Sequence, residues 1–174
     1  MTERTGVATF QGNPLTLIGD EVQVGQTSPD FTVLTTGLEP YSLADGKGKV
    51  RILNVVLSLD TGICNTQGRR FAQEAAGLPG VDILTISADL PFAQARWANE
   101  AGVGDTQQLL SDHRDLSFGQ AYGLVVKELR LIARSLFVLD ADDTIVYAQY
   151  MNELAAEPDY APALAAAKEA AGIS

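Results

Sequence analysis

The sequence predicts an α/β fold in which helices pack on a central sheet. Two nearly continuous apolar segments, 50–57 and 81–87, fit strands that are buried on both faces. Each is followed by a segment with apolar residues at helical spacing, at about 63–76 and 89–101. Buried strands that alternate with helices are typical of a layered α/β domain.

The N-terminal part of the chain predicts a β-hairpin. Residues 7–10 and 15–18 have strand character, and the turn sequence Gln11-Gly12-Asn13-Pro14 separates them. A further short strand is expected at 31–34, before the first buried strand. The hairpin, over about residues 6–18, therefore precedes the main fold as an extension.

The C-terminal half completes the sheet and adds two helices. We expect a strand at 108–110, a short helix at 117–122, two strands at about 134–139 and 144–150, and an alanine-rich helix from Pro158 to near Ala171. The order of elements corresponds to a thioredoxin-like fold with an N-terminal β-hairpin extension. No linker or repeat interrupts the chain, so residues 1–174 are expected to form one domain.

Composition and charge exclude several classes of partner. The formal net charge is −10, which argues against nucleic acids and anionic membranes, since both need a basic surface. No apolar run approaches the roughly 20 residues that span a bilayer, and residues 1–10 lack the apolar stretch of a signal peptide. A cytoplasmic location is therefore expected. No metal, haem, flavin or nucleotide motif is visible, and Gly46-Lys47-Gly48-Lys49 is interpreted as a turn, so no cofactor is expected.

The single cysteine, Cys64, is the candidate reactive residue. One cysteine excludes an internal disulfide and a cysteine-based zinc site. Cys64 follows the turn after the first buried strand and falls in the first turn of the next helix, where free backbone N–H groups favour an anion and thus the nucleophilic thiolate. The alternative is an inert core cysteine, because free cysteine is often buried. The single histidine, His113, lies in a polar turn at 111–115 and is interpreted as a surface residue.

A resemblance to a known family sharpens this interpretation. The segment Ser58-Leu59-Asp60-Thr61-Gly62-Ile63-Cys64 resembles the peroxidatic motif of the peroxiredoxins, in which a threonine lies three residues before the cysteine. Four further segments resemble the thiol peroxidase (Tpx) branch, at residues 10–14, 86–94, 133–134 and 157–160. The segments occur in the same order and span nearly the whole chain.

The resemblance implies a role for three residues. Cys64 would attack a hydroperoxide and become a sulfenic acid. Thr61 would hydrogen-bond the thiolate and the peroxide, although a threonine before a helix is also a common N-cap. Arg134 would hold the thiolate and polarise the O–O bond, for which a planar, always charged guanidinium is suited; the alternative is a strand-end arginine in a surface ion pair. Arg69 and Arg70 are expected on the helix surface.

The chain departs from the family pattern at two positions. Ala98 stands where many thiol peroxidases carry a second, resolving cysteine, so it is either the natural residue of a one-cysteine form or a replacement for cysteine. In a natural one-cysteine form, an outside thiol, such as a thioredoxin-type protein or a low-molecular-weight thiol, must reduce the sulfenic acid. Leu57 stands where the motif has proline and leaves a backbone N–H that proline lacks.

The sequence thus predicts a thiol peroxidase that reduces hydrogen peroxide and alkyl hydroperoxides. Two alternatives stay open, a peroxide sensor that passes its oxidised state to a partner through a mixed disulfide, and an inert scaffold. The resemblance also implies a homodimer that packs near the active-site helix. The apolar residues Phe92 and Trp97 could line that contact or belong to the core.

Overall fold

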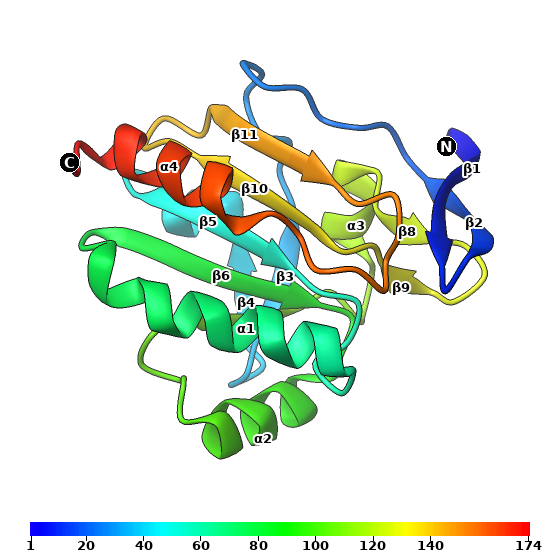
Figure 1. Cartoon of the computed structure of the whole chain (residues 1–174), viewed down its shortest axis with the longest axis horizontal. Helices are drawn as coiled ribbons and strands as arrows, with labels where there is room; N and C mark the ends of the chain where they lie inside the picture. The colour runs from blue at the N-terminus through cyan, green and yellow to red at the C-terminus, as the bar shows by residue number, and fades with distance from the viewer.

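Seven strands form the central sheet of the protein, whose computed structural model describes residues 1–174 (Figure 1). Its strand order is β11-β10-β5-β6-β7-β3-β4. The three parallel strands in the middle are β5 (Val50–Val55), β6 (Val81–Ser87) and β7 (Gln108–Ser111). Antiparallel strands flank them, β10 (Ser135–Leu139) and β11 (Ile145–Tyr150) on one side and β3 (Thr32–Thr35) and β4 (Pro40–Ser42) on the other. The strands predicted after the hairpin are thus all present in this sheet, in a thioredoxin-like α/β arrangement.

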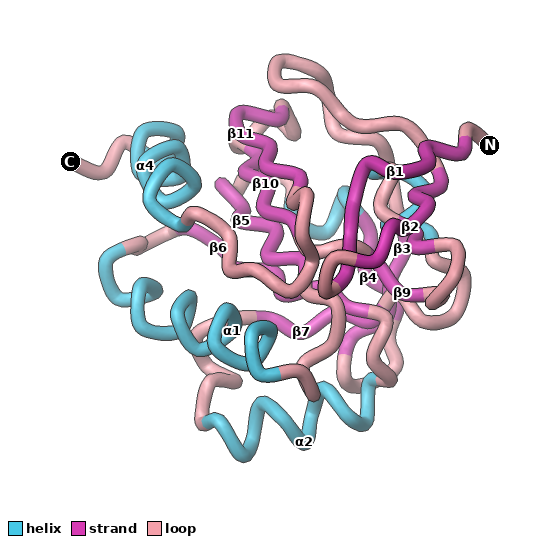
Figure 2. The backbone as a smooth tube through the Cα atoms, turned by 45° about the vertical axis from the view of Figure 1, so that its right-hand side comes forward, coloured by secondary structure: helices cyan, strands magenta, loops and turns pink.

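A second, smaller sheet contains the N-terminal hairpin. The strands β1 (Glu3–Phe10) and β2 (Asn13–Ile18) pair with each other, and β2 also pairs with β8 (Val125–Val126), which pairs with β9 (Leu131–Ile132). Figure 2 shows this sheet on the side of the molecule away from α4 (Tyr160–Ala171). The strands β4, β8 and β9 were not predicted, because two or three residues are too few to show an alternating pattern.

Helices cover the central sheet. α1 (Gly62–Glu74) and α4 lie together in front of the middle strands in Figure 1. Phe71 of α1 and Tyr160 of α4 meet edge to face, their ring centroids 5.6 Å apart, over Ile52 of β5 and Leu136 of β10. α2 (Pro91–Ala101) packs against β7, and α3 (Ser117–Tyr122) packs against β3. Two short 3₁₀ turns, Leu43–Gly46 and Ala75–Gly77, complete the fold.

Two local predictions need correction. The last helix begins at Tyr160 and not at Pro158, because the carboxylate of Asp159 accepts the N–H of Ala161 and caps the helix there. The interpretation of His113 as a surface residue holds only in part, because the turn 111–115 is partly buried. Asp112 is buried, and its carboxylate accepts the N–H groups of Phe118 and Gly119. His113 is half-buried and makes no hydrogen bond with Cys64.

The topology brings three chain segments to one edge of the sheet. β5 and β6 are parallel, so the residues after Val55 and after Ser87 emerge at the same edge. β10 runs antiparallel to β5 with Ser135 opposite Val55, so Arg134 arrives at that edge as well. The carboxyl ends of strands are where open α/β sheets form their functional sites.

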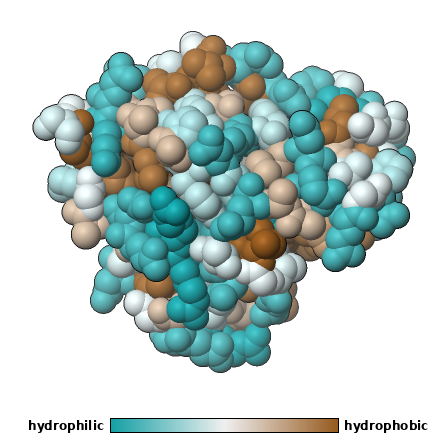
Figure 3. Space-filling model, in the orientation of Figure 1, coloured by the Kyte–Doolittle hydropathy of each residue, from teal (hydrophilic) through white to brown (hydrophobic).

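Polar side chains dominate the surface. In Figure 3 apolar residues reach the visible face only in scattered groups, in keeping with the net charge of −10. None of the helices has the length and apolar character needed to traverse a bilayer.

Candidate active site

Cys64 lies in the first turn of α1 with its side chain 0 % exposed. Thr61 is the N-cap of this helix, since its hydroxyl oxygen accepts the N–H of Cys64 at 3.3 Å. The same hydroxyl donates to the carbonyl of Ser58 at 2.9 Å, so the interpretation of Thr61 as a cap is confirmed and its hydrogen bonds do not reach the sulfur. The sulfur instead accepts the backbone N–H of Ser58 at 3.4 Å.

Asp89 holds the loop that precedes Cys64. It follows β6, and its carboxylate accepts the hydroxyl of Ser58 at 2.7 Å and the N–H of Leu59 at 2.8 Å. The hydroxyl of Ser87 also donates to it at 2.8 Å. The carboxylate therefore ties the 58–59 loop to the neighbouring strand end and fixes the N–H of Ser58 toward the Cys64 sulfur.

Arg134 is buried directly before β10, with 1 % of its surface exposed. Its Nε donates to the carbonyl of Leu154 at 2.9 Å, and its Nη1 donates to Oε1 of Gln67 at 2.7 Å. No carboxylate pairs with it, so the alternative of a surface ion pair is wrong. Nη2 makes no hydrogen bond within the protein. Gln67 follows Cys64 by three residues, about one helical turn, so Arg134 reaches the cysteine helix through this amide.

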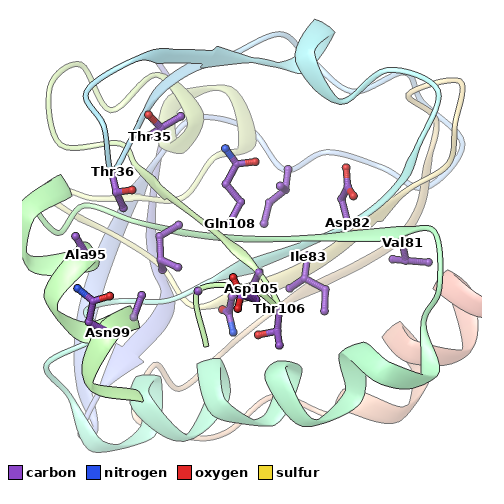
Figure 4. A pocket seen from close by; sticks show the side chains of 15 residues that line it. Thr35, Thr36, Val81, Asp82, Ile83, Ala95, Asn99, Asp105, Thr106 and Gln108 are labelled. Atoms are coloured by element: carbon purple, nitrogen blue, oxygen red, sulfur yellow. The ribbon is translucent and has the colours of Figure 1, made fainter. Parts of the chain in front are cut away.

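The structure also places the other residues that the sequence singled out. Arg69 and Arg70 are exposed on α1, and Arg70 pairs with Glu74 at 2.9 Å. Leu57 is buried, and its backbone N–H makes no hydrogen bond within the protein. Ala98 is buried on α2 and lines a cavity of about 550 Å³ between α2 and the β6–β7 side of the sheet. Figure 4 shows this cavity, with Ala95 and Asn99 of α2 among its labelled residues. Cys64 does not line this cavity, so the cavity beside Ala98 is separate from the thiol.

The chain is similar to known proteins over most of its length. The Redoxin family model matches residues 23–164. A thiol peroxidase from Bacillus subtilis is 58% identical over 92% of this chain and 95% of its own length. Another from Halalkalibacterium halodurans is 55% identical over 93% of this chain and 97% of its own length.

The chain belongs to the thiol peroxidase branch of the peroxiredoxins. Among solved structures, a peroxiredoxin-like protein from Aquifex aeolicus superposes with a TM-score of 0.87 and 32% identity, covering 96% of this chain and 97% of that one. The family resemblance of the sequence and the thioredoxin-like fold are thereby confirmed.

Sequence reasoning gave no role to three residues of this thiol peroxidase site. Ser58 and Asp89 stand inside segments that resemble the family, but the contact between them depends on the pairing of β5 with β6. Gln67 shows a weak signal, a polar residue one turn after Cys64 on the buried side of α1. Only its contact with Arg134, which follows it by 67 positions, reveals what it holds.

Proposed function

We propose that this chain is a peroxidase that reduces hydrogen peroxide and alkyl hydroperoxides, with Cys64 as the reacting thiol. The assignment rests on the groups that surround the Cys64 sulfur. Cys64 lies at the positive end of α1, its sulfur accepts the N–H of Ser58, and a buried arginine with a free Nη2 lies at the same sheet edge. The thiol peroxidase relatives support the same chemistry.

The chemistry assigns one task to each group. The Cys64 thiolate attacks the terminal oxygen of the hydroperoxide, an S–O bond forms and the O–O bond breaks. The leaving alkoxide, or hydroxide from hydrogen peroxide, takes a proton from the solvent and departs as an alcohol or as water. Cys64 is left as a sulfenic acid. Arg134 stabilises the charge that develops on the oxygens through Nη2, while Gln67 and Leu154 hold the rest of its guanidinium. Thr61 orients the first turn of α1 through its cap.

Recycling requires an external thiol, because Cys64 is the only cysteine and is free. One thiol attacks the sulfenic sulfur, which releases water and forms a mixed disulfide. A second thiol then releases the Cys64 thiolate as the external disulfide forms. Both thiol groups come from a thioredoxin-type protein or from low-molecular-weight thiols. Since the Cys64 side chain is fully buried, this step requires the first turn of α1 to move outward.

The test is peroxide consumption by the purified chain with a thioredoxin system or with excess dithiothreitol. Multiple turnovers per chain are expected, and the Cys64→Ser variant should show none. The control must melt like the parent protein, so that loss of activity reports the thiol and not the fold. Equal consumption by parent and variant would reject the assignment.

The absence of a resolving cysteine favours one alternative, a peroxide sensor. No second thiol lies in the chain, so the sulfenic acid persists until a partner thiol traps it. A sensor would consume about one equivalent of peroxide per chain under every reductant. The same titration therefore separates the two functions.

We also propose a cytoplasmic homodimer. The face beside the active site carries Phe92, 68 % exposed, and Leu90, 53 % exposed, at the start of α2, which suits a contact between two copies. Trp97, in contrast, is buried against α1 and belongs to the core. A lone thiol that depends on reductants suits a reducing compartment. Light scattering at high concentration should give twice 18.5 kDa, and a Phe92→Ser variant should shift it toward the monomer mass.

A further inference from the structure

A chain of buried polar side chains begins and ends on the cysteine helix. Nε2 of Gln67 donates to Oδ1 of Asn54 on β5 at 2.5 Å, and Nδ2 of Asn54 donates to the hydroxyl of Thr85 on β6 at 3.0 Å. The Thr85 hydroxyl donates to Oε1 of Gln107, whose Nε2 donates to the carbonyl of Gly68 at 2.8 Å. We call Gln67, Asn54, Thr85 and Gln107 the polar clamp.

Burial makes the polar clamp unusual for a core. Asn54, Gln67 and Thr85 are 0 % exposed, and Gln107 is 6 % exposed. Asn54 and Thr85 are register partners on β5 and β6, between strand residues that are mostly apolar. Buried polar groups are costly unless each has its partner, whereas apolar side chains of the same size would fill the space in several arrangements. The polar set therefore specifies one position of α1 on the sheet.

The polar clamp fixes the positions of the two proposed reacting groups, Cys64 and Arg134. The clamp holds Gln67 and Gly68, three and four residues after Cys64. Gln67 Oε1 at the same time accepts Nη1 of Arg134. The Gln67 amide thus fixes both the position of α1 on the sheet and the position of the Arg134 guanidinium.

The indole of Trp97 on α2 contacts the cysteine helix α1 on the side that faces α2. A Cβ on Gly68 would lie 2.6 Å from the Trp97 ring, so the helix touches the indole directly, and Nε1 of Trp97 donates to Oδ1 of Asn65 at 2.7 Å. Trp97 is the only tryptophan of the chain, so its fluorescence reports on the seating of α1.

We propose that Thr85 and Gln107 are positioning residues of the peroxidase, which hold the Cys64 helix in the closed, peroxide-reactive position through the polar clamp. The inference rests on the proposed function of Cys64. Neither side chain is within the hydrogen-bonding reach of Cys64 or Arg134, and both act through Gln67 and Gly68. A weaker clamp lets the first turns of α1 move away from Arg134, so the thiolate loses its alignment while it becomes more accessible.

The test compares two reactions of the same thiolate. Thr85→Val keeps the branched shape and removes the hydroxyl, and Gln107→Met keeps the length and removes both hydrogen bonds. The rate of peroxide attack is measured by stopped-flow Trp97 fluorescence, and access is measured by the rate of Cys64 alkylation with iodoacetamide. We expect peroxide attack to fall by about tenfold or more, since a misplacement on the order of 1 Å can cost about 10²-fold, while alkylation becomes faster.

A slower peroxide attack together with a faster alkylation of Cys64 distinguishes a positioning role from other effects. A change in the thiolate fraction would move both rates in the same direction, and a purely structural role would leave both rates of the folded protein unchanged. Thr106→Val is the matched control, because its hydroxyl donates only to Val103 within its own loop, and it should retain both rates. Gln107 lies at the rim of the core, so its variant keeps the test available if Thr85→Val does not fold cooperatively by circular dichroism.

Unchanged rates, or rates that shift together in both variants, would overturn the positioning role while the parent protein still turns over peroxide. Absence of turnover in the parent protein would instead remove the proposed function on which the inference rests.

Discussion

Arg134 is held from two sides, by a buried polar network in the core and by a loop that is tied to the N-terminal hairpin. On one side, Gln67 and the polar clamp support it with neutral, fully paired groups in the core. On the other side, the Leu154 carbonyl supports it from a surface loop. Glu153 fixes that loop to the N-terminal hairpin, since its carboxylate accepts the Thr9 hydroxyl and the N–H groups of Gln11 and Gly12.

The difference lies in the dependence on charge. The hydrogen bond from Thr9 is the largest cause that lowers the pKa of Glu153 to about 2, so this support is complete only while the carboxylate is ionised. The polar clamp contains no titratable group. The hairpin extension thus contributes a pH-sensitive support to a site whose other support is insensitive to pH.

The largest effect is expected where the two supports meet. Arg134→Lys keeps the charge but loses the planar fork that bonds Gln67 and Leu154 and leaves Nη2 for the proposed contact with the peroxide. The rate of peroxide attack should fall by about 10²–10³-fold, as for other losses of a donor to a developing oxyanion. Stopped-flow fluorescence measures it, and a variant within a few-fold of the parent would show that Arg134 only packs.

A smaller effect should follow from pushing α1 off its seat. Gly68→Ala places a methyl group 2.6 Å from the Trp97 ring, and overpacking of this kind costs about 1–3 kcal/mol of the free energy of unfolding. Gly77→Ala is the matched control, because no atom lies within 4 Å of the added Cβ. Urea denaturation of both variants measures the cost, and equal stabilities would mean that α1 is not seated tightly on the indole.

The smallest effect should come from the surface support. The folded-state pKa of Glu153, about 2, lies below its ordinary value of 4.5, so its stabilisation is fully present above about pH 4.5 and is lost as the pH falls through about 2. Glu153→Gln should therefore be less stable than the parent at pH 7, and the two should converge between pH 4.5 and 2. Urea denaturation across this range measures the gap, and a gap independent of pH would contradict the ionised support.

A second carboxylate, Asp112, also changes the stability in the acid range, so the effect of Glu153 must be measured as a difference between the parent and Glu153→Gln. Burial raises the pKa of Asp112 from 3.8 to about 6, so Asp112 contributes stability below about pH 3.8 that is lost as the pH rises through about 6. The two carboxylates act in opposite directions in the acid range. Asp112 is present in both proteins, so its titration cancels in the difference between parent and Glu153→Gln.

The sequence by itself determined the local features of this protein. The apolar runs predicted β5 and β6, and the turn before Cys64 predicted where α1 begins, with the cysteine in its first turn. That Cys64 is the reacting residue stays a prediction. The turn around Gly12 predicted the hairpin. These features depend on residues within a few positions of one another, which is the range over which periodicity and capping act.

The tertiary structure alone decided what supports the site. Thr85 and Asn54 look like ordinary polar exceptions in their strands until the parallel register places them side by side. For Arg134 the sequence left a surface ion pair open as an alternative, until Gln67 and Leu154 were found to hold the guanidinium in the core. The partners are 20 to 67 positions apart along the chain, and strand pairing and helix packing, not sequence spacing, decide which buried polar groups meet.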